Sequence, residues 1–364
     1  MCSCQKIRSL RCRSHRYSGT SLASRNKSAL LYIVADPGSR ASRLLHRCAA
    51  ALLTLAGAAV PALAMADADA PKDIRIGYQK SSINLLVAKQ LGLVERRFPG
   101  THIQWNEFPA GPQLLEALGA GSLDFGMTGD TPPVFAQAGG SDVIYAGVEP
   151  PKPGSSAILV PPDSGIAALK DLRGKRIAFQ KGSSSHYLVL RALQQAGLQY
   201  KDIQPVYLAP ADARAAFESH SIDAWAIWDP YWAAAERNTP ARVLTTGTGL
   251  SDNNTFYLSS RKFADHHAQA IRSLFDILSD ADRRVQQHPA DAPGLIAAAT
   301  GLDPEVAKLF LSRRPPSPVG PLSPAVIATQ QVLADTYAQA GLIPHPIKVA
   351  DAVWQPGSAL AASR

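Results

Sequence analysis

The chain has 364 residues, 46% of them hydrophobic, and a formal net charge of +8. This length is enough to bury one large core or two smaller ones. Residues 1–64 hold ten of the 37 Lys and Arg residues and one of the 29 acidic residues, which leaves 27 bases and 28 acids in the remainder. Because the basic excess belongs to the N-terminal segment, a nucleic-acid partner for the rest of the chain loses its main support.

The N-terminal segment has the pattern of a secretory signal peptide over about residues 40–64. Three arginines precede the apolar run 48–60, and small-x-small cleavage sites end at Ala64 and Ala66. The run is shorter than the roughly 20 residues of a membrane-spanning helix. We therefore predict a periplasmic protein with a doubtful or disordered extension at residues 1–39. A mitochondrial transit peptide is the alternative, because this region is rich in Arg and Ser.

All four cysteines (Cys2, Cys4, Cys12 and Cys48) precede the predicted cleavage site. The mature chain would therefore have neither a disulfide framework nor a thiolate metal site. The sequence contains no G-x-S-x-G, P-loop or H-E-x-x-H motif, and its histidines lack metal-ligand spacing. These observations predict a protein that is not an enzyme and uses no metal or cofactor.

From Asp73 onward, short apolar strands alternate with helical patterns, which is typical of an α/β fold. Two pairs of segments match at offsets of 101 and 99 residues. Residues 75–80 (R-I-G-Y-Q-K) match 176–181 (R-I-A-F-Q-K), and residues 117–130 match 216–229 around a shared S-[LI]-D. These matches indicate a weak internal repeat, and hence two similar halves.

The halves predict two lobes that the chain connects by two crossover segments, 148–162 and 249–259. The first lobe comprises residues 73–155 and 256–357, and the second comprises residues 156–255. Apolar residues at helical spacing predict helices in both lobes and along the C-terminal part, which we expect to pack on the first lobe. The predicted helices are 83–94, 186–198, 264–287, 290–301, 304–311 and 324–340.

Open α/β sheets bind ligands beyond the carboxyl ends of their strands. Two facing lobes would therefore direct four loops into one cleft. These loops are Gln79–Ser82, Gly129–Thr131, Gln180–His186 and Trp228–Tyr231.

The segment D-F-G-M-T-G-D-T-P-P-V-F (residues 124–135) illustrates the chemistry of these loops. Thr131 or Asp130 is expected to cap a helix that starts at Pro132. Free N–H groups and the positive end of such a helix favour an anion. The other loops also carry hydroxyl groups ahead of helices, with Lys80 and Lys181 nearby. The loops contain no arginine, so the sequence does not indicate bidentate recognition of a carboxylate.

Several residues in the loops admit more than one function. Asp130 and Asp229 are unexpected in an anion site, and each can cap a helix, bind Lys or N–H groups across the cleft, or pair with a ligand ammonium. Trp228 at a strand end can cover an apolar ligand tail or belong to the core. His186 can donate to an anion or only cap its helix.

Five segments carry a resemblance to a known family: I-G-Y-Q-K, W-N-E-F-P-A-G-P-Q-L-L-E-A-L, G-S-L-D-F-G-M-T-G-D-T-P-P-V-F-A-Q-A, Y-L-A-P-A-D-A-R-A-A-F and I-D-A-W-A-I-W-D-P-Y. With these segments, the chain resembles the aliphatic-sulfonate-binding proteins of bacterial ABC importers, which are similar to taurine- and nitrate-binding proteins. The resemblance covers about residues 73–357. It implies a type II-like periplasmic binding fold with the ligand cleft between two lobes and the crossovers as hinges. It also implies a monomer that delivers an alkanesulfonate to a membrane permease and its ATPase for sulfur acquisition.

Transferred to this sequence, the resemblance implies a ligand-binding set from the same loops: Gln79, Lys80, Ser81, Ser82, Gly129, Asp130, Thr131, Ser183, Ser184, Ser185, His186, Trp228 and Asp229. A binder of taurine, nitrate or an aromatic sulfonate is the nearest alternative. An enzyme of pyrimidine-precursor synthesis with the same fold is a further alternative, which the secretory leader disfavours.

Overall fold

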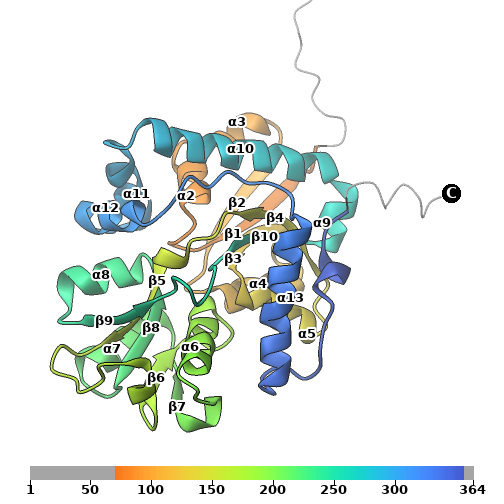
Figure 1. Cartoon of the computed structure of the whole chain (residues 1–364). Helices are drawn as coiled ribbons and strands as arrows, with labels where there is room; N and C mark the ends of the chain where they lie inside the picture. The colour runs from red at the N-terminus through yellow and green to blue at the C-terminus, as the bar shows by residue number, and fades with distance from the viewer. Residues whose placement is uncertain (1–69, 356–364) are drawn as a thin grey trace, which may run out of the picture. The chain divides into compact units, whose positions relative to one another are not determined.

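The computed structural model describes residues 70–355 (Figure 1). The predicted signal peptide, the four cysteines and the tail 357–364 lie outside the described residues. Within them, the chain forms two five-stranded mixed sheets, each covered by helices on both faces. We call the part built on each sheet the first lobe and the second lobe. The α/β, two-lobed fold class predicted from the sequence is confirmed.

The first lobe has the strand order β2-β1-β3-β10-β4. Strands β1, β2 and β3 run parallel, and β10 runs antiparallel to both β3 and β4. The strands are β1 (Asp73–Tyr78), β2 (His102–Glu107), β3 (Phe125–Gly129), β4 (Val143–Glu149) and β10 (Thr255–Ser260). Its helices are α2 (Ile83–Gln90), α3 (Leu93–Arg97), α4 (Gly111–Gly119) and α5 (Thr131–Ala138), followed by the C-terminal α9 (Arg261–His266), α10 (Ala268–Gln287), α11 (Ala292–Thr300), α12 (Pro304–Ser312) and α13 (Pro324–Gln339).

The second lobe repeats this arrangement with the strand order β7-β6-β8-β5-β9. Here β5 takes the antiparallel position that β10 takes in the first lobe. The strands are β5 (Ser156–Val160), β6 (Arg176–Phe179), β7 (Gln204–Tyr207), β8 (Ala224–Trp228) and β9 (Arg242–Thr246), and the helices are α6 (Ser184–Gln195), α7 (Pro210–Glu218) and α8 (Tyr231–Asn238). The chain crosses from β4 to β5 and returns from β9 to β10.

The internal repeat is confirmed by a matching ion pair in each lobe. Arg75 at the start of β1 binds Asp124, with its Nη2 atom 2.7 Å from Oδ1 and its backbone nitrogen 2.9 Å from Oδ2. Arg176 at the start of β6 binds Asp223 through the same atoms, at 2.9 and 2.7 Å. These pairs lie at the amino ends of the parallel strands, opposite the cleft. These ion pairs stabilise the amino ends of the strands, and the carboxyl ends face the cleft.

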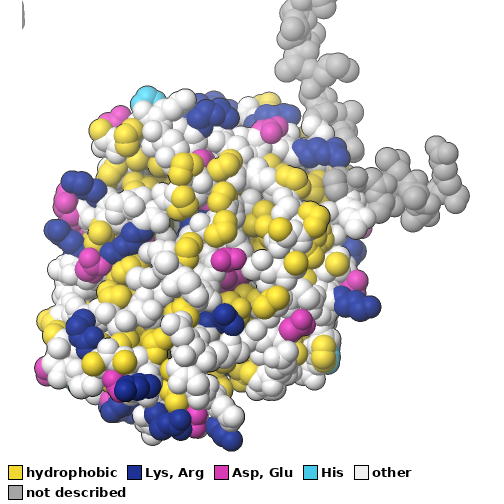
Figure 2. Space-filling view, viewed as in Figure 1, with side chains coloured by type: hydrophobic (Ala, Val, Ile, Leu, Met, Phe, Trp, Pro, Cys, Tyr) yellow, Lys and Arg dark blue, Asp and Glu magenta, His cyan; other side chains and the backbone are white. Residues whose placement is uncertain are grey.

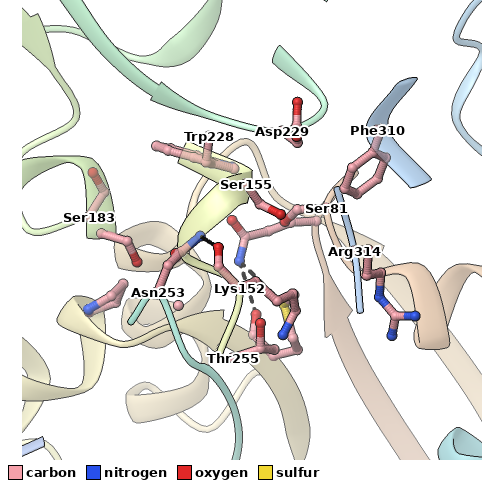
Figure 3. Close-up of a pocket in the computed structure, with 16 residues that line it drawn as sticks. Ser81, Lys152, Ser155, Ser183, Trp228, Asp229, Asn253, Thr255, Phe310 and Arg314 are labelled. Atoms are coloured by element: carbon pink, nitrogen blue, oxygen red, sulfur yellow. Dashed lines mark hydrogen bonds between the residues drawn. The ribbon is translucent and has the colours of Figure 1, made fainter. Parts of the chain in front are cut away.

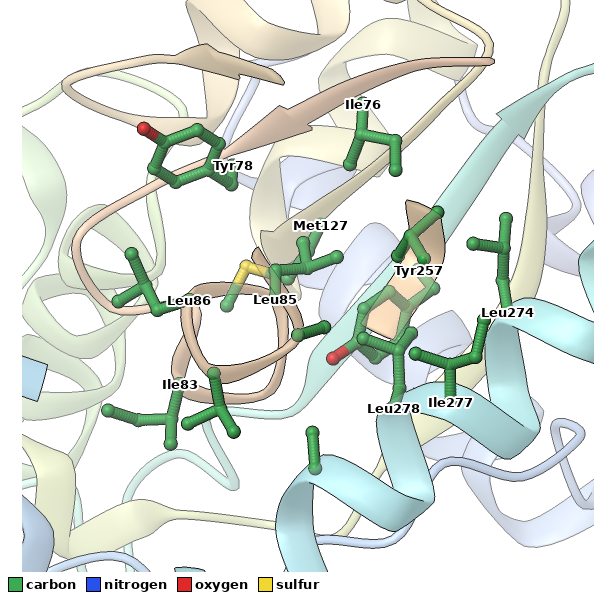
Figure 4. Close-up of a cluster of buried hydrophobic side chains, with 14 of the residues drawn as sticks. Ile76, Tyr78, Ile83, Leu85, Leu86, Met127, Tyr257, Leu274, Ile277 and Leu278 are labelled. Carbon is green, nitrogen blue, oxygen red and sulfur yellow. The ribbon is translucent and has the colours of Figure 1, made fainter. Parts of the chain in front are cut away.

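The strand pattern explains how both faces of the first sheet are covered. Tyr257 of β10 faces a core formed with α2 and α10, whereas its neighbours Phe256 and Leu258 face a core formed with α4, α5 and α13. Alternation of side chains along a strand produces this division. Figure 4 shows the first of these cores, where side chains of β1, α2, β3, β10 and α10 gather.

Two predicted helices are interrupted. The predicted helix 83–94 ends at Gln90, because Gly92 has a φ of 58°, which terminates a right-handed helix. The predicted helix 264–287 is divided into α9 and α10 at His267, whose φ of −131° and ψ of 44° are not helical. In residues 70–355, no helix is both long and apolar enough to cross a membrane.

Candidate functional site

A cavity of about 60 Å³ lies between the two lobes at the carboxyl ends of the strands (Figure 3). The first lobe contributes Gln79, Ser81, Gly111, Met127, Gly129 and Pro132. The second lobe contributes Ser183, Ser184, Trp228 and Asp229. The two crossovers contribute Lys152, Ser155, Asn253 and Thr255, and the end of α12 and the residues after it contribute Phe310 and Arg314.

Helix N-termini surround this cavity. Helices α2, α4 and α5 start directly after β1, β2 and β3, and α6 and α8 start directly after β6 and β8. The first N–H groups of a helix have no partner within it, and the helix dipole is positive at that end. Helix N-termini, which favour anions, therefore meet at the cavity from both lobes.

The side chains of the N-cap residues of α5 and α6 do not cap these helices. Neither Asp130 nor Ser183 makes a side-chain capping bond, which differs from the capping expected at residue 130. Ser183 instead donates to the carbonyl of Gln180 at 2.8 Å. Ser184 interacts with the carboxylate of Asp130 across the cleft, which favours the ionised form of Asp130. The first N–H groups of α6 are therefore not bound by the side chain of Ser183, whereas at α8 the N–H of Ala233 donates to Asp229 Oδ1 at 2.9 Å.

Seven of the residues predicted for the site line the cavity: Gln79, Ser81, Gly129, Ser183, Ser184, Trp228 and Asp229. Gln79 is fixed by a hydrogen bond from its Nε2 atom to the carbonyl of Met127 at 3.0 Å. Trp228 at the end of β8 is 9% exposed, and it lies with Phe310 on the cavity wall. The cavity thus combines polar donors with apolar side chains.

The structure places the other predicted residues behind the cavity wall. Lys80 donates to the carbonyl of Thr300 at 2.9 Å. Ser82 is buried and accepts the N–H of Gln79 at 2.9 Å. The Thr131 hydroxyl donates to Asp130, and Asp130 is itself buried. Burial raises the pKa of Asp130 to about 6, although the bonds from Ser184 and Thr131 oppose that rise.

Ser185 and His186 also lie outside the cavity, because both are fully buried on the inner face of α6. His186 stacks on Phe179 with ring centroids 4.8 Å apart, and its Nδ1 atom accepts the N–H of Gly182 at 3.3 Å. Burial, and then the charge of Lys181, lowers the pKa of His186 to about 3. A neutral imidazole in this position supports the packing of α6 and does not contact the cavity.

Sequence reasoning missed the residues of the crossovers and of the C-terminal helices. Asn253 and Thr255 face the cavity, whereas Asp252 and Asn254 face a hollow on the other side. Asn253 has a φ of 50°, and the polar run D-N-N-T has no hydrophobic period that would mark which side chains face the cavity. Arg314 has no sequence signal either, because its partner Asp282 is distant in sequence and the two meet only in the folded chain.

Lys152 and Arg314 belong to a buried polar network in the cavity wall. Lys152 lies 3.0 Å from Glu149, and Arg314 lies 2.7 Å from Asp282 and 2.8 Å from the side-chain oxygen of Asn84. Burial opposes ionisation of Glu149, but Lys152 and Arg314 together hold its pKa below the usual value. Two cations and two carboxylates leave the network neutral.

The charge on one face of the molecule gives no support to a nucleic-acid partner there. On the face shown in Figure 2, Lys and Arg side chains are interspersed with Asp and Glu side chains.

Among residues 70–355, no group of three or more His, Cys, Asp or Glu side chains is arranged to hold a metal ion.

Comparison with known proteins places the chain in a family. The model of the "NMT1/THI5 like" family matches residues 80–292. The crystal structure of the periplasmic aliphatic sulphonate binding protein SsuA from Escherichia coli is 48% identical, with a TM-score of 0.73, and the match covers 78% of this chain and 98% of that one.

Two further relatives have different ligands in their names. The alkanesulfonate-binding protein SsuA from Xanthomonas axonopodis pv. citri, bound to MOPS, is 48% identical with a TM-score of 0.76, over 78% of this chain and 98% of that one. The taurine-binding periplasmic protein of Escherichia coli (strain K12) is 26% identical over 71% of this chain and 89% of that one.

Proposed function

Since the chain belongs to the NMT1/THI5-like family, we propose that it is the periplasmic solute-binding component of an ABC importer for aliphatic sulfonates. In this proposal the mature protein is a monomer that captures an alkanesulfonate and delivers it to a membrane permease and its ATPase for sulfur acquisition. It performs no catalysis. The signal peptide over about residues 40–64 directs it to the periplasm.

The observation that carries the proposal is the composition of the cavity between the lobes. A sulfonate is a permanent anion with three acceptor oxygens, so it suits several N–H and hydroxyl donors. Helix N-termini from both lobes, together with Ser81 and Ser184, provide such donors. The walls formed by Met127, Trp228 and Phe310 suit the aliphatic tail.

The crossovers connect ligand binding to motion of the lobes. Ser155 and Asn253 line the cavity from the two crossover segments. Asn253 also donates to the carbonyl of Lys152 at 3.2 Å, which joins one crossover to the other. A ligand that contacts both lobes and both crossovers stabilises the closed arrangement over an open one.

A thermal melt of the mature protein against a ligand panel tests the proposal. Alkanesulfonates should raise the melting temperature, because ligand at a hundredfold excess over its dissociation constant stabilises the folded state by roughly 2.7 kcal/mol. Nitrate, an aromatic sulfonate and pyridoxal phosphate are the controls. A rise with one of these and none with any alkanesulfonate would refute the assignment.

A further inference from the structure

Asp229 lines the cavity that we assign to an anion, and its carboxylate lies behind the cavity wall. It follows β8 directly, and its side chain is fully buried. A buried carboxylate without a partner is costly, and near a sulfonate it would repel the ligand. The same group would attract a ligand that carries an ammonium on its tail. The partners of Asp229 therefore affect which sulfonates the cavity accepts.

The partner of Asp229 comes from the other lobe. Arg313, directly after α12, places its Nη1 atom 3.1 Å from Oδ1 and 3.4 Å from Oδ2 of Asp229. Oδ1 also accepts the N–H of Ala233 at 2.9 Å. The carboxylate thus has one fixed cation and one fixed N–H donor.

Arg313 is held in this position by two other contacts with α8. Its guanidinium lies 3.6 Å from the centroid of the Trp232 ring, and Nη2 binds the carboxylate of Glu236. The side chain is only 14% exposed. To pair with Asp229, a ligand ammonium would have to compete with a guanidinium that is fixed by a ring and a second carboxylate.

We propose that Arg313 determines the specificity of the cavity: by occupying Asp229, it makes the site select sulfonates with an apolar tail over sulfonates with an ammonium on the tail. This inference rests on the proposed function, and it identifies the substrate class within it. Arg313 itself does not line the cavity, so it acts through Asp229. Burial raises the pKa of Asp229 to about 7 even with Arg313 beside it, which weakens its charge toward a ligand further.

Propanesulfonate and taurine form a matched pair of probes, because an ammonium in taurine takes the place of the terminal methyl group. Titration calorimetry measures both affinities for the wild type and for Arg313→Gln, Asp229→Asn and the double variant. The wild type should prefer propanesulfonate. Arg313→Gln should move the affinity ratio toward taurine by about tenfold or more, because the ammonium of taurine can then take the place of the guanidinium and favour the ionised form of Asp229.

The double variant distinguishes this effect from a general disturbance. Adding Asp229→Asn to Arg313→Gln should return the ratio to the wild-type side, because the carboxylate is removed. Arg283→Gln, at an exposed position of α10, is the control and should leave the ratio unchanged. If Arg313→Gln does not fold, Arg313→Met keeps the contact with Trp232 and should show the same shift.

The outcomes are separable from those of the proposed function. If neither probe nor any longer alkanesulfonate binds the wild type, the proposed function fails. If propanesulfonate binds and the ratio is the same in the wild type and the folded Arg313 variant, the specificity role of Arg313 is wrong. A shift that persists in the double variant would also overturn it, because the effect would then not pass through Asp229.

Discussion

The hydroxyl of Ser184 lies directly against Gly129 across the cleft, so that a Cβ atom added to Gly129 would be 2.1 Å from Ser184 Oγ. Gly129 ends β3 in the first lobe, and Ser184 starts α6 in the second. The two lobes therefore approach each other so closely here that Ser184 must shift to admit a methyl group. Ser184 is both a candidate ligand donor and a residue of one lobe in contact with the other.

We predict that Gly129→Ala weakens alkanesulfonate binding by about tenfold or more, because the added methyl group holds the lobes apart. The fold should be retained, since each lobe keeps its own core. Titration calorimetry of Gly129→Ala, Ser184→Ala and the double variant checks this. In the Ser184→Ala background the extra methyl group should cost little, because Oγ is gone. Equal losses from Gly129→Ala in both backgrounds would contradict the steric account.

Trp228→Ala should reduce the affinity for pentanesulfonate more than that for methanesulfonate, because the indole covers the tail and not the sulfonate. Trp228 also belongs to the core of the second lobe, so the free energy of unfolding should fall by about 3–5 kcal/mol. Calorimetry at a temperature at which the variant is folded gives the affinities, and urea unfolding gives the stability. Equal losses for both ligands would remove Trp228 from the tail site.

Arg314→Ala should lower the free energy of unfolding by about 3–5 kcal/mol, because it leaves Asp282 and Glu149 buried with too little countercharge. Arg283→Ala removes an exposed ion pair, and should change stability by less than about 1 kcal/mol. Urea unfolding of both variants measures the difference. A fall of less than about 1 kcal/mol with Arg314→Ala would contradict the role of this network in stabilising the fold.

His186 should make the protein less stable in acid. The pKa of its neutral, buried ring is lowered to about 3, whereas an unfolded histidine titrates near 6.5. This contribution is therefore complete above pH 6.5 and is lost as the pH falls below it, by up to about 1.4 kcal/mol per pH unit. His186→Phe should flatten this part of the profile.

Other groups titrate in the same range, so the comparison with wild type is essential. Asp130 and Asp229 have raised pKa values, and their contributions are lost as the pH rises, which is the opposite direction. Urea midpoints from pH 7.5 to 4.5 measure the slope for wild type, His186→Phe and the exposed control His345→Gln. Parallel profiles for wild type and His186→Phe would disprove the assignment.

The architecture was predictable because it rests on local patterns. Hydrophobic periodicity gives the strands and helices, and the repeated R-I and S-[LI]-D segments give the two halves. The positions of Gly92 and His267, which interrupt two predicted helices, depend on backbone angles that periodicity does not report.

The site was predictable only in part, for a physical reason. Residues that follow parallel strands, such as Gln79 and Ser184, reach the cleft through topology alone. The cleft also contains Lys152, Phe310 and Arg314, which belong to a crossover and to the C-terminal part of the chain. These segments contact residues that are distant in sequence, so the contacts exist only in the folded chain. The sequence places His186 at the start of a predicted helix and hence at the cleft, but that helix buries it against Phe179.

The central claim is that the two lobes together hold a sulfonate by its head at the helix N-termini and by its tail at the aromatic wall. A crystal structure with 3-bromopropanesulfonate tests it most directly, because anomalous scattering locates bromine and sulfur separately. The account predicts sulfur beside Ser81, Gly129 and Ser184, and bromine near Trp228 and Phe310. Bromine at the helix N-termini, or the ligand bound outside the cavity, would contradict it.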